Sequence, residues 1–225
     1  MAQDHTQYKS HVDEFFSYPE NQKFEYVCCP LCDDTKEIVL FKKQTMDVYR
    51  CKCGMVYNKR QPTQEVLDRF YTESGAMTDW VNLKKTKHEE TRQYEKYGRA
   101  VEKLMSFNIS SIIDIGCGTG FFLSMFPEYI KRVGIEQNQA SLDVAINNGV
   151  KAVNLSMNEL SNKASQIAKC DAVSLWGVLE HAKDPIGLIQ NAHDILNDDG
   201  YLCVCVPNVD SALDRDWETA SHFAI

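Results

Sequence analysis

The sequence has no long apolar run and no excess of basic residues, and each absence excludes a class of protein. Nowhere do about 18 apolar residues follow one another, and residues 1–23 are mainly polar, so neither a membrane span nor a secretory signal is readable. Lys and Arg total 24 against 32 Asp and Glu, which gives a formal net charge of -8. Nucleic-acid binding needs a basic footprint. We therefore expect a cytoplasmic protein without a membrane or nucleic-acid partner.

Cysteine is plentiful, but its pattern does not suit a disulfide framework. The nine cysteines are an odd number, and five of them lie between residues 28 and 53. Clustered thiols in a chain without a secretory signal are typical of a metal site. The other four, Cys117, Cys170, Cys203 and Cys205, lie in or beside expected strands, where cysteine acts as a small apolar residue.

Two closely spaced thiol pairs flank a segment, residues 38–49, that is able to form a hairpin. The pairs are Cys29 with Cys32 and Cys51 with Cys53. Tetrahedral zinc takes four thiolates, and four thiolates leave no position open for water or substrate. We therefore expect a zinc-ribbon-like module with a closed structural zinc site, in which Cys28 is a spare ligand. The alternative is a reduced hairpin without metal.

The chain divides into four segments by pattern. Residues 1–26 form a polar lead-in without clear periodicity, residues 27–60 the cysteine module, and residues 61–108 connecting helices that cover the ligand site. In residues 109–225 strands and helices alternate, which favours an α/β fold, a Rossmann-like parallel sheet with helices on both faces. Strands are predicted at 111–115, 132–136, 151–155, 171–176 and 201–206, and helices near 119–127, 138–148, 157–168 and 185–197.

A glycine-rich turn follows the first of these strands. Glycines at 116, 118 and 120 remove Cβ atoms where a ligand approaches the backbone, and Glu136 ends the next strand, where a carboxylate can accept both ribose hydroxyls. A dinucleotide-binding turn wants a further glycine at position 121, which is Phe here. The turn therefore predicts a ribose-bearing ligand other than a dinucleotide.

The pattern Asp114-x-Gly-x-Gly-x-Gly, with Glu136 and with Leu179-Glu180-His181 after the fourth strand, resembles the class I S-adenosylmethionine-dependent methyltransferases. The resemblance runs from residue 27 to about residue 210 and includes relatives with an N-terminal zinc-ribbon-like element. It implies a cofactor site made of Asp114, Gly116, Cys117, Gly118, Gly120, Glu136, Gln137, Ser156, Met157 and Trp176. Gln137 would lie near the adenine, with Ser156 and Met157 as further adenine candidates. Trp176 would line the pocket or, alternatively, only pack against the sheet.

The resemblance implies methyl transfer to a small-molecule acceptor, and O-methylation of a hydroxyl group on a sugar or secondary metabolite is the favoured reading. His181 is the candidate base, because histidine titrates near neutral pH; alternatively it only hydrogen-bonds a loop. Related enzymes that use a catalytic metal carry an acid where this chain has Gly177, which disfavours such a metal. N- or C-methylation, a non-catalytic binding or scaffold protein and, least favoured, a nicotinamide dehydrogenase remain open.

The family sheet continues beyond its fifth strand, but only 19 residues follow Val206. We therefore expect a truncated domain that lacks the C-terminal strands and is inactive by itself, or else a protein partner that covers the apolar edge of strand 201–206.

Overall fold

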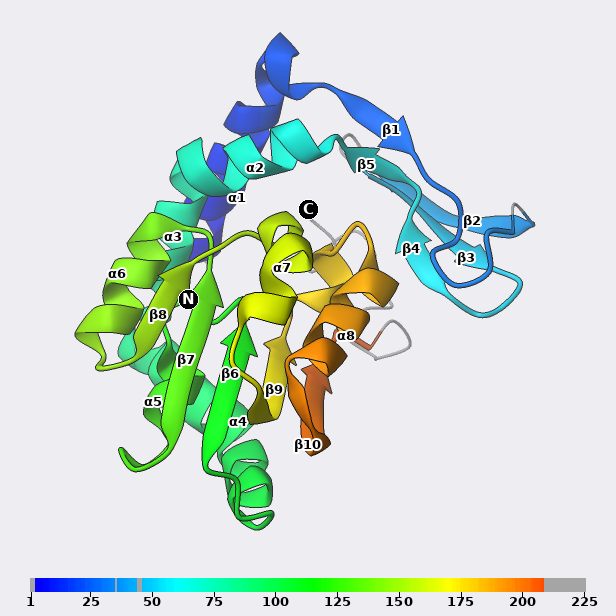
Figure 1. Ribbon diagram of the computed structural model, residues 1–225. Helices are drawn as coiled ribbons and strands as arrows, with labels where there is room; N and C mark the ends of the chain where they lie inside the picture. The colour runs from blue at the N-terminus through cyan, green and yellow to red at the C-terminus, as the bar shows by residue number, and fades with distance from the viewer. Residues whose placement is uncertain (1–2, 35, 44–45, 209–225) are drawn as a thin grey trace.

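The computed structural model describes residues 3–34, 36–43 and 46–208, and it contains three β-sheets (Figure 1). The largest has five parallel strands: β6 (Ser111–Ile115), β7 (Lys131–Glu136), β8 (Lys151–Asn154), β9 (Cys170–Trp176) and β10 (Leu196–Cys205). Their order is β10-β9-β6-β7-β8. The predicted Rossmann-like parallel sheet is confirmed.

Helices cover both faces of this sheet, and the alternation of side chains along β6 decides which helices lie where. Ile112 packs with α4 (Lys87–Met105), α5 (Phe121–Ser124) and α6 (Gln139–Asn147), whereas Ile113 faces α7 (Met157–Lys163) and α8 (Pro185–Asp194). Both isoleucines are buried to 4% exposure or less. Since neither face of the central strands is left to water, β6 and β9 read as apolar runs rather than as polar alternations.

Several helices begin at side chains that cap their free backbone amides. Asn138 caps α6, Asp184 caps α8 with Pro185 following it, and Ser156 forms a capping box with Glu159 at α7. The helix after the glycine turn, predicted at 119–127, is only the four residues of α5. The chain leaves the helical path before Pro127, as the restricted residue before a proline favours.

The N-terminal segment corrects the expectation of a lead-in without periodicity. Residues Gln3–Ser17 form a helix, α1, that packs against α3 (Gly75–Lys84). Val12, Phe15 and Phe16 lie at helical spacing and are buried with Val66 and Phe70 of α2 (Gln64–Glu73). A short 3-10 turn, Pro19–Asn21, follows α1. Together α1, α2 and α3 lie beyond the carboxyl ends of the parallel strands (Figure 1).

The cysteine module, predicted at residues 27–60, extends over residues 24–62 in the structure and consists of two small antiparallel sheets. Strands β2 (Glu37–Lys43), β3 (Met46–Cys51) and β4 (Val56–Asn58) form one, and β1 (Phe24–Tyr26) pairs with β5 (Arg60–Pro62) in the other. The module contacts the large domain through Lys183, whose ammonium group donates to the Pro62 carbonyl oxygen and pairs with the Glu25 carboxylate. Lys183 follows the 3-10 turn Leu179–His181, so the module reaches the loop that carries His181.

The last described strand, β10, pairs with β9 on one side. The segment that follows, residues 209–225, lies outside the described residues, and so does what the sequence predicts there. Within the described ranges, no helix has both the length and the apolar character needed to cross a membrane.

Candidate functional site

A cavity of about 200 Å³ lies at the carboxyl ends of the central strands. Strand β6 is flanked by β7 on one side and β9 on the other, so the chain reverses its direction of travel across the sheet at this point. Open parallel sheets bind ligands at such a switch point, outside the carboxyl ends of the strands. The topology therefore positions the cavity where the sequence predicts a ligand.

The first two glycines of the turn line this cavity and leave no room for a side chain. Gly116 and Gly118 have φ values of 71° and 53°, in the left-handed region. A Cβ atom on Gly116 would lie 2.4 Å from a methyl carbon of Val178, and one on Gly118 would lie 2.7 Å from the ring of Trp80. Both positions thus need glycine for conformation and for space.

The third glycine has a different reason to be glycine. Gly120 also has a φ of 71°, but a Cβ atom there would meet Ala145 at 2.9 Å and Val150 at 3.2 Å, where α6 ends behind the turn. Among the described residues that line the cavity, Gly120 is absent. The structure thus gives Gly120 a role in packing α6 against the turn, and its contact with the cofactor stays a prediction.

Asp114 is buried at the floor of the cavity. It lies beside Ser174 in the register of β6 and β9, on the same sheet face, and Ser174 Oγ donates a hydrogen bond of 2.6 Å to Asp114 Oδ1. Burial raises the pKa of Asp114 to about 7, although the Ser174 hydrogen bond favours the ionised form. A carboxyl group in this state attracts a cationic ligand strongly, because little water screens it.

Glu136 ends β7 and reaches back to the glycine turn. Its Oε2 atom accepts a 2.9 Å hydrogen bond from the Gly118 amide, and Oε1 accepts one of 2.8 Å from the Asn138 amide. Burial raises the pKa of Glu136, while the hydrogen bonds from the Asn138, Gly118 and Gln137 amides oppose the rise. These bonds fix the carboxylate beside the turn and leave it lone-pair capacity for a ligand hydroxyl.

Two of the three residues predicted to lie near the adenine line the cavity, and the third does not. Gln137 and Met157 line the cavity, and they also line an adjoining cavity of about 90 Å³ together with Tyr71 and His181. Ser156 lies outside both linings, in the described part of the chain, and its hydroxyl group is used in the capping box of α7.

The other predicted residues, Cys117, Trp176 and His181, also line the main cavity. Cys117 Sγ is buried against the carbonyl oxygen of Gly118, 3.7 Å away. Trp176 both lines the cavity and packs against Phe122, with ring centroids 5.1 Å apart, so both readings of this residue hold. His181 lies 4.0 Å from the Glu180 carboxylate, beyond hydrogen-bond distance.

The roof of the cavity contains residues that sequence patterns did not single out as site residues. Tyr8 comes from α1, Tyr71 from α2, Trp80 and Lys84 from α3, and Tyr97 from α4. The Asn138 side-chain amide donates to the Tyr71 carbonyl oxygen at 2.7 Å, which fastens α2 next to Glu136. The helical spacing of Met77, Trp80 and Lys84, after the Ser74 cap, was the signal available for α3.

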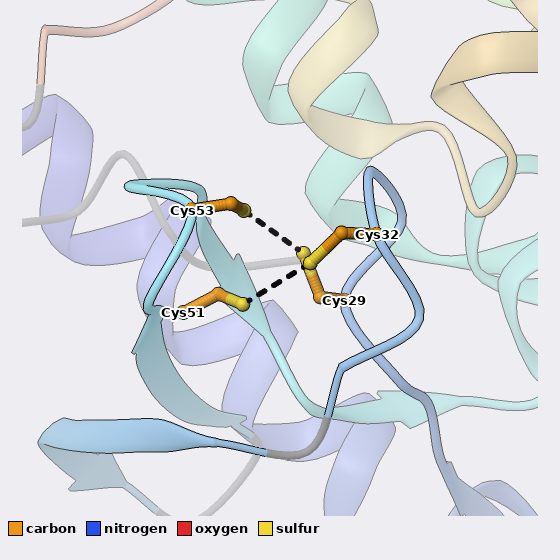
Figure 2. A group of neighbouring side chains, drawn as sticks. All are labelled: Cys29, Cys32, Cys51 and Cys53. Atoms are coloured by element: carbon orange, nitrogen blue, oxygen red, sulfur yellow. Dashed lines mark hydrogen bonds between the residues drawn. The ribbon is translucent and has the colours of Figure 1, made fainter.

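The four predicted metal ligands lie together (Figure 2). The sulfur atoms of Cys29, Cys32, Cys51 and Cys53 are all within 4.8 Å of one another, with separations of 3.6 Å for Cys29 and Cys53 and 3.5 Å for Cys32 and Cys51. Zn–S bonds of about 2.3 Å in a tetrahedron place sulfurs roughly 3.8 Å apart. The donor set therefore fits zinc, and Cys28 is exposed and outside the cluster.

Two backbone turns hold the cysteine pairs in this arrangement. The Asp33 amide donates to the Cys29 carbonyl oxygen at 3.0 Å and the Gly54 amide to that of Cys51 at 2.9 Å. Asp33 and Gly54 have φ values of 53° and 93°, which turn the chain tightly after each pair.

Comparison with known proteins identifies what the large domain is similar to. A model of the methyltransferase domain family matches residues 87–225. An uncharacterized methyltransferase from Schizosaccharomyces pombe is 27% identical over an alignment of 105 residues, which covers 41% of this chain and 38% of the relative. The chain therefore spans less than half the length of the curated relative it matches.

Two solved structures share the fold. An O-methyltransferase family protein from Burkholderia thailandensis has a TM-score of 0.52 and 17% identity, over 66% of this chain and 48% of that one. The plantazolicin methyltransferase BpumL, solved with S-adenosylhomocysteine (SAH) and a plantazolicin analogue, has a TM-score of 0.51 and 16% identity, over 71% and 68% of the two chains.

Proposed function

This chain belongs to the methyltransferase domain family, and from that premise we propose that it transfers the methyl group of S-adenosylmethionine (SAM) to a small-molecule acceptor. The observation that carries the proposal is the pair of buried carboxyl groups, Asp114 and Glu136, on either side of a glycine turn that has no room for side chains. A cationic ligand with a ribose diol satisfies both acids.

Each part of SAM has residues of matching chemistry in the cavity. Glu136 keeps lone-pair capacity for a ribose hydroxyl, and the glycine turn and Asp114 suit the positively charged methionine portion. Gln137 and Met157 lie beyond Glu136 and suit the adenine. The Gln137 side-chain amide has no hydrogen-bond partner in the described part of the protein, so it is available to the base.

The chemical step needs positioning more than activation, because a sulfonium methyl group is already electrophilic. The protein must hold the acceptor in line with the S–CH3 bond and exclude water. For a hydroxyl acceptor a base must also take a proton, and His181 is our candidate because it lines the cavity. His181 lines both the main cavity and the smaller one.

O-methylation of a hydroxyl group on a sugar or secondary metabolite is the reaction we favour, since a histidine beside the cavity suits proton removal from oxygen. N- and C-methylation are the runners-up. A non-catalytic binding or scaffold role is the alternative in another class, and it requires cofactor binding without turnover.

Methyl transfer from SAM carrying a tritiated methyl group to a deproteinised metabolite extract tests the proposal. We expect label in small molecules with the wild-type protein and none with the Asp114→Asn, Glu136→Gln double variant. Binding of SAM without any transfer, measured on the full-length gene product, supports the scaffold alternative instead.

For the cysteine cluster we propose one structural zinc ion held by Cys29, Cys32, Cys51 and Cys53. When bound, the ion cross-links the segment before β2 to the end of β3. Pro62 and Glu25, which lie on either side of the cysteine cluster in the sequence, contact Lys183, two residues after His181.

A further inference from the structure

Tyr97 has a hydroxyl group that nothing in the described protein satisfies. Its ring, on α4, packs edge-on against Trp176 and Phe122 with centroid separations of 4.9 and 5.3 Å, and the residue lines the main cavity. No hydrogen-bond partner for the hydroxyl group is found among the described residues. The hydroxyl oxygen is not among the fully buried unpartnered atoms, so it is open to the cavity and can donate to a molecule bound there.

The order of the strands places Tyr97 at a particular end of the cavity. Glu136 and Gln137 follow β7, and Met157 follows β8, on one side of β6. Tyr97 contacts Trp176 at the end of β9, on the other side of β6. With ribose and adenine over β7 and β8, the β9 side of the cavity would be left for the methyl group and the acceptor. Tyr97 lies on that side.

The hydroxyl group is a donor and not a base. Burial raises the pKa of Tyr97, and the nearby negative charge of Asp114 raises it further, so the phenol stays protonated throughout the neutral range. A protonated phenol needs a lone pair to donate to. At this end of the cavity, the nucleophilic atom of the acceptor supplies one.

The surroundings of Tyr97 also describe the shape of the acceptor. Phe121, Phe122 and Trp176 present aromatic rings next to it, and the Lys96 ammonium lies 5.2 Å from the Tyr97 ring and 5.6 Å from that of Trp176. Aromatic walls favour the flat faces of ring compounds. The acceptor that this wall suits is a hydroxylated ring.

We propose that the Tyr97 hydroxyl group donates a hydrogen bond to the nucleophilic oxygen of a ring-bearing acceptor and aims its second lone pair at the sulfonium methyl group. The assignment rests on the proposed function. In the step, the O–CH3 bond forms while the S–CH3 bond breaks, and the electron pair of the broken bond stays on sulfur. The proton of the acceptor's own hydroxyl group passes to His181, and Tyr97 keeps its proton. The products are the methyl ether and SAH.

The test compares Tyr97→Phe with Tyr94→Phe. Each substitution removes one hydroxyl group from α4 and keeps the ring. Tyr94 lies one turn earlier, is 58% exposed, contacts the same Phe121 at 4.9 Å and is outside the described cavity lining. SAH binding is measured by titration calorimetry, and transfer is measured from tritiated SAM to the metabolite extract. Thermal unfolding of both variants shows that the packing is kept, and a crystal structure with SAH locates the hydroxyl group.

We expect Tyr97→Phe to bind SAH within about twofold of wild type and to transfer methyl groups at least roughly tenfold more slowly, as the loss of one transition-state hydrogen bond implies. Tyr94→Phe should match wild type in both. In the SAH complex, Tyr97 Oη should make no hydrogen bond to SAH and should face the open side of the sulfur atom.

The assignment is overturned if Tyr97→Phe weakens SAH binding about tenfold, if Oη hydrogen-bonds SAH, or if transfer is as fast as in wild type. A wild-type protein that fails to bind SAH refutes the proposed function itself. The two failures are distinguishable, because the second is seen without any variant.

Discussion

Ser174 Oγ donates a 2.6 Å hydrogen bond to Asp114 Oδ1, and within the described part of the protein no other hydrogen bond reaches this buried carboxyl group. The bond joins β6 and β9, the two strands between which the order of the strands along the chain changes direction. Burial outweighs the effect of this hydrogen bond, so the pKa of Asp114 is raised to about 7. The fraction of Asp114 that is ionised, and can attract a cationic cofactor, therefore changes with pH in the physiological range.

The first prediction is a pH-dependent affinity for SAM. Asp114 is mostly protonated below its raised pKa and ionised above it, so affinity should rise by roughly tenfold between pH 6 and pH 8 if binding needs the ionised form. Ser174→Ala removes the bond that favours ionisation, so it should move the midpoint to higher pH. Asp114→Asn should bind SAM weakly and without this pH dependence. Titration calorimetry between pH 6 and pH 8 measures the SAM affinity of each variant. A wild-type affinity that does not change with pH contradicts the prediction.

The second prediction concerns the space above the glycine turn. Gly118→Ala places a methyl group 2.7 Å from Trp80, inside the cavity lining, and should weaken SAM binding at least tenfold. Gly149→Ala is the matched control, since Gly149 also has a left-handed φ, 75°, but has no atom within 4 Å of an added Cβ. Both variants should be less stable to unfolding by about 1 kcal/mol because of backbone strain. Equal SAM affinity of the two variants would show that the space above Gly118 is not needed for SAM binding.

The third prediction separates turnover from binding at His181. His181→Ala removes the candidate base and should slow methyl transfer to a hydroxyl acceptor by roughly 100-fold while SAM affinity stays within about threefold. His193→Ala is the control, because His193 is an exposed side chain on α8. Unchanged turnover in His181→Ala would remove this residue from the mechanism.

The fourth prediction is that the purified protein holds one zinc ion per chain. Cys51→Ser removes a buried ligand, so it should abolish zinc retention and lower the unfolding temperature of the module. Cys28→Ser removes an exposed thiol outside the cluster and should do neither. Metal analysis and thermal unfolding of both variants check this. Well under one zinc per wild-type chain would refute the site.

Local sequence signals were sufficient for the sheet and the floor of the site. The strand predicted at 111–115 has the same bounds in the structure, because a buried parallel strand reads as an apolar run that ends at glycine. The two acids were found from the predicted strands, because Asp114 lies next to the end of one strand and Glu136 ends the following one. The four clustered cysteines were equally readable, because ligand spacing is local.

The roof of the site was not predictable in the same way. Tyr8 and Trp80 reach the cavity only because α1 and α3 fold back over the sheet, and no local pattern specifies that packing. The packing of Gly120 against Ala145 was also beyond the reach of its spacing, because Ala145 is a tertiary neighbour. Tyr97 likewise reaches the cavity only because α4 packs against the end of β9, where its ring contacts Trp176.

The central claim is that Asp114 and Glu136 form a SAM site, and titration calorimetry with SAH tests it most directly. We predict one SAH molecule per wild-type chain, at least tenfold weaker binding by Glu136→Gln, and unchanged binding by Glu128→Gln, which alters an exposed acid. No heat of binding from wild type, or equal affinity of the two variants, would contradict the account.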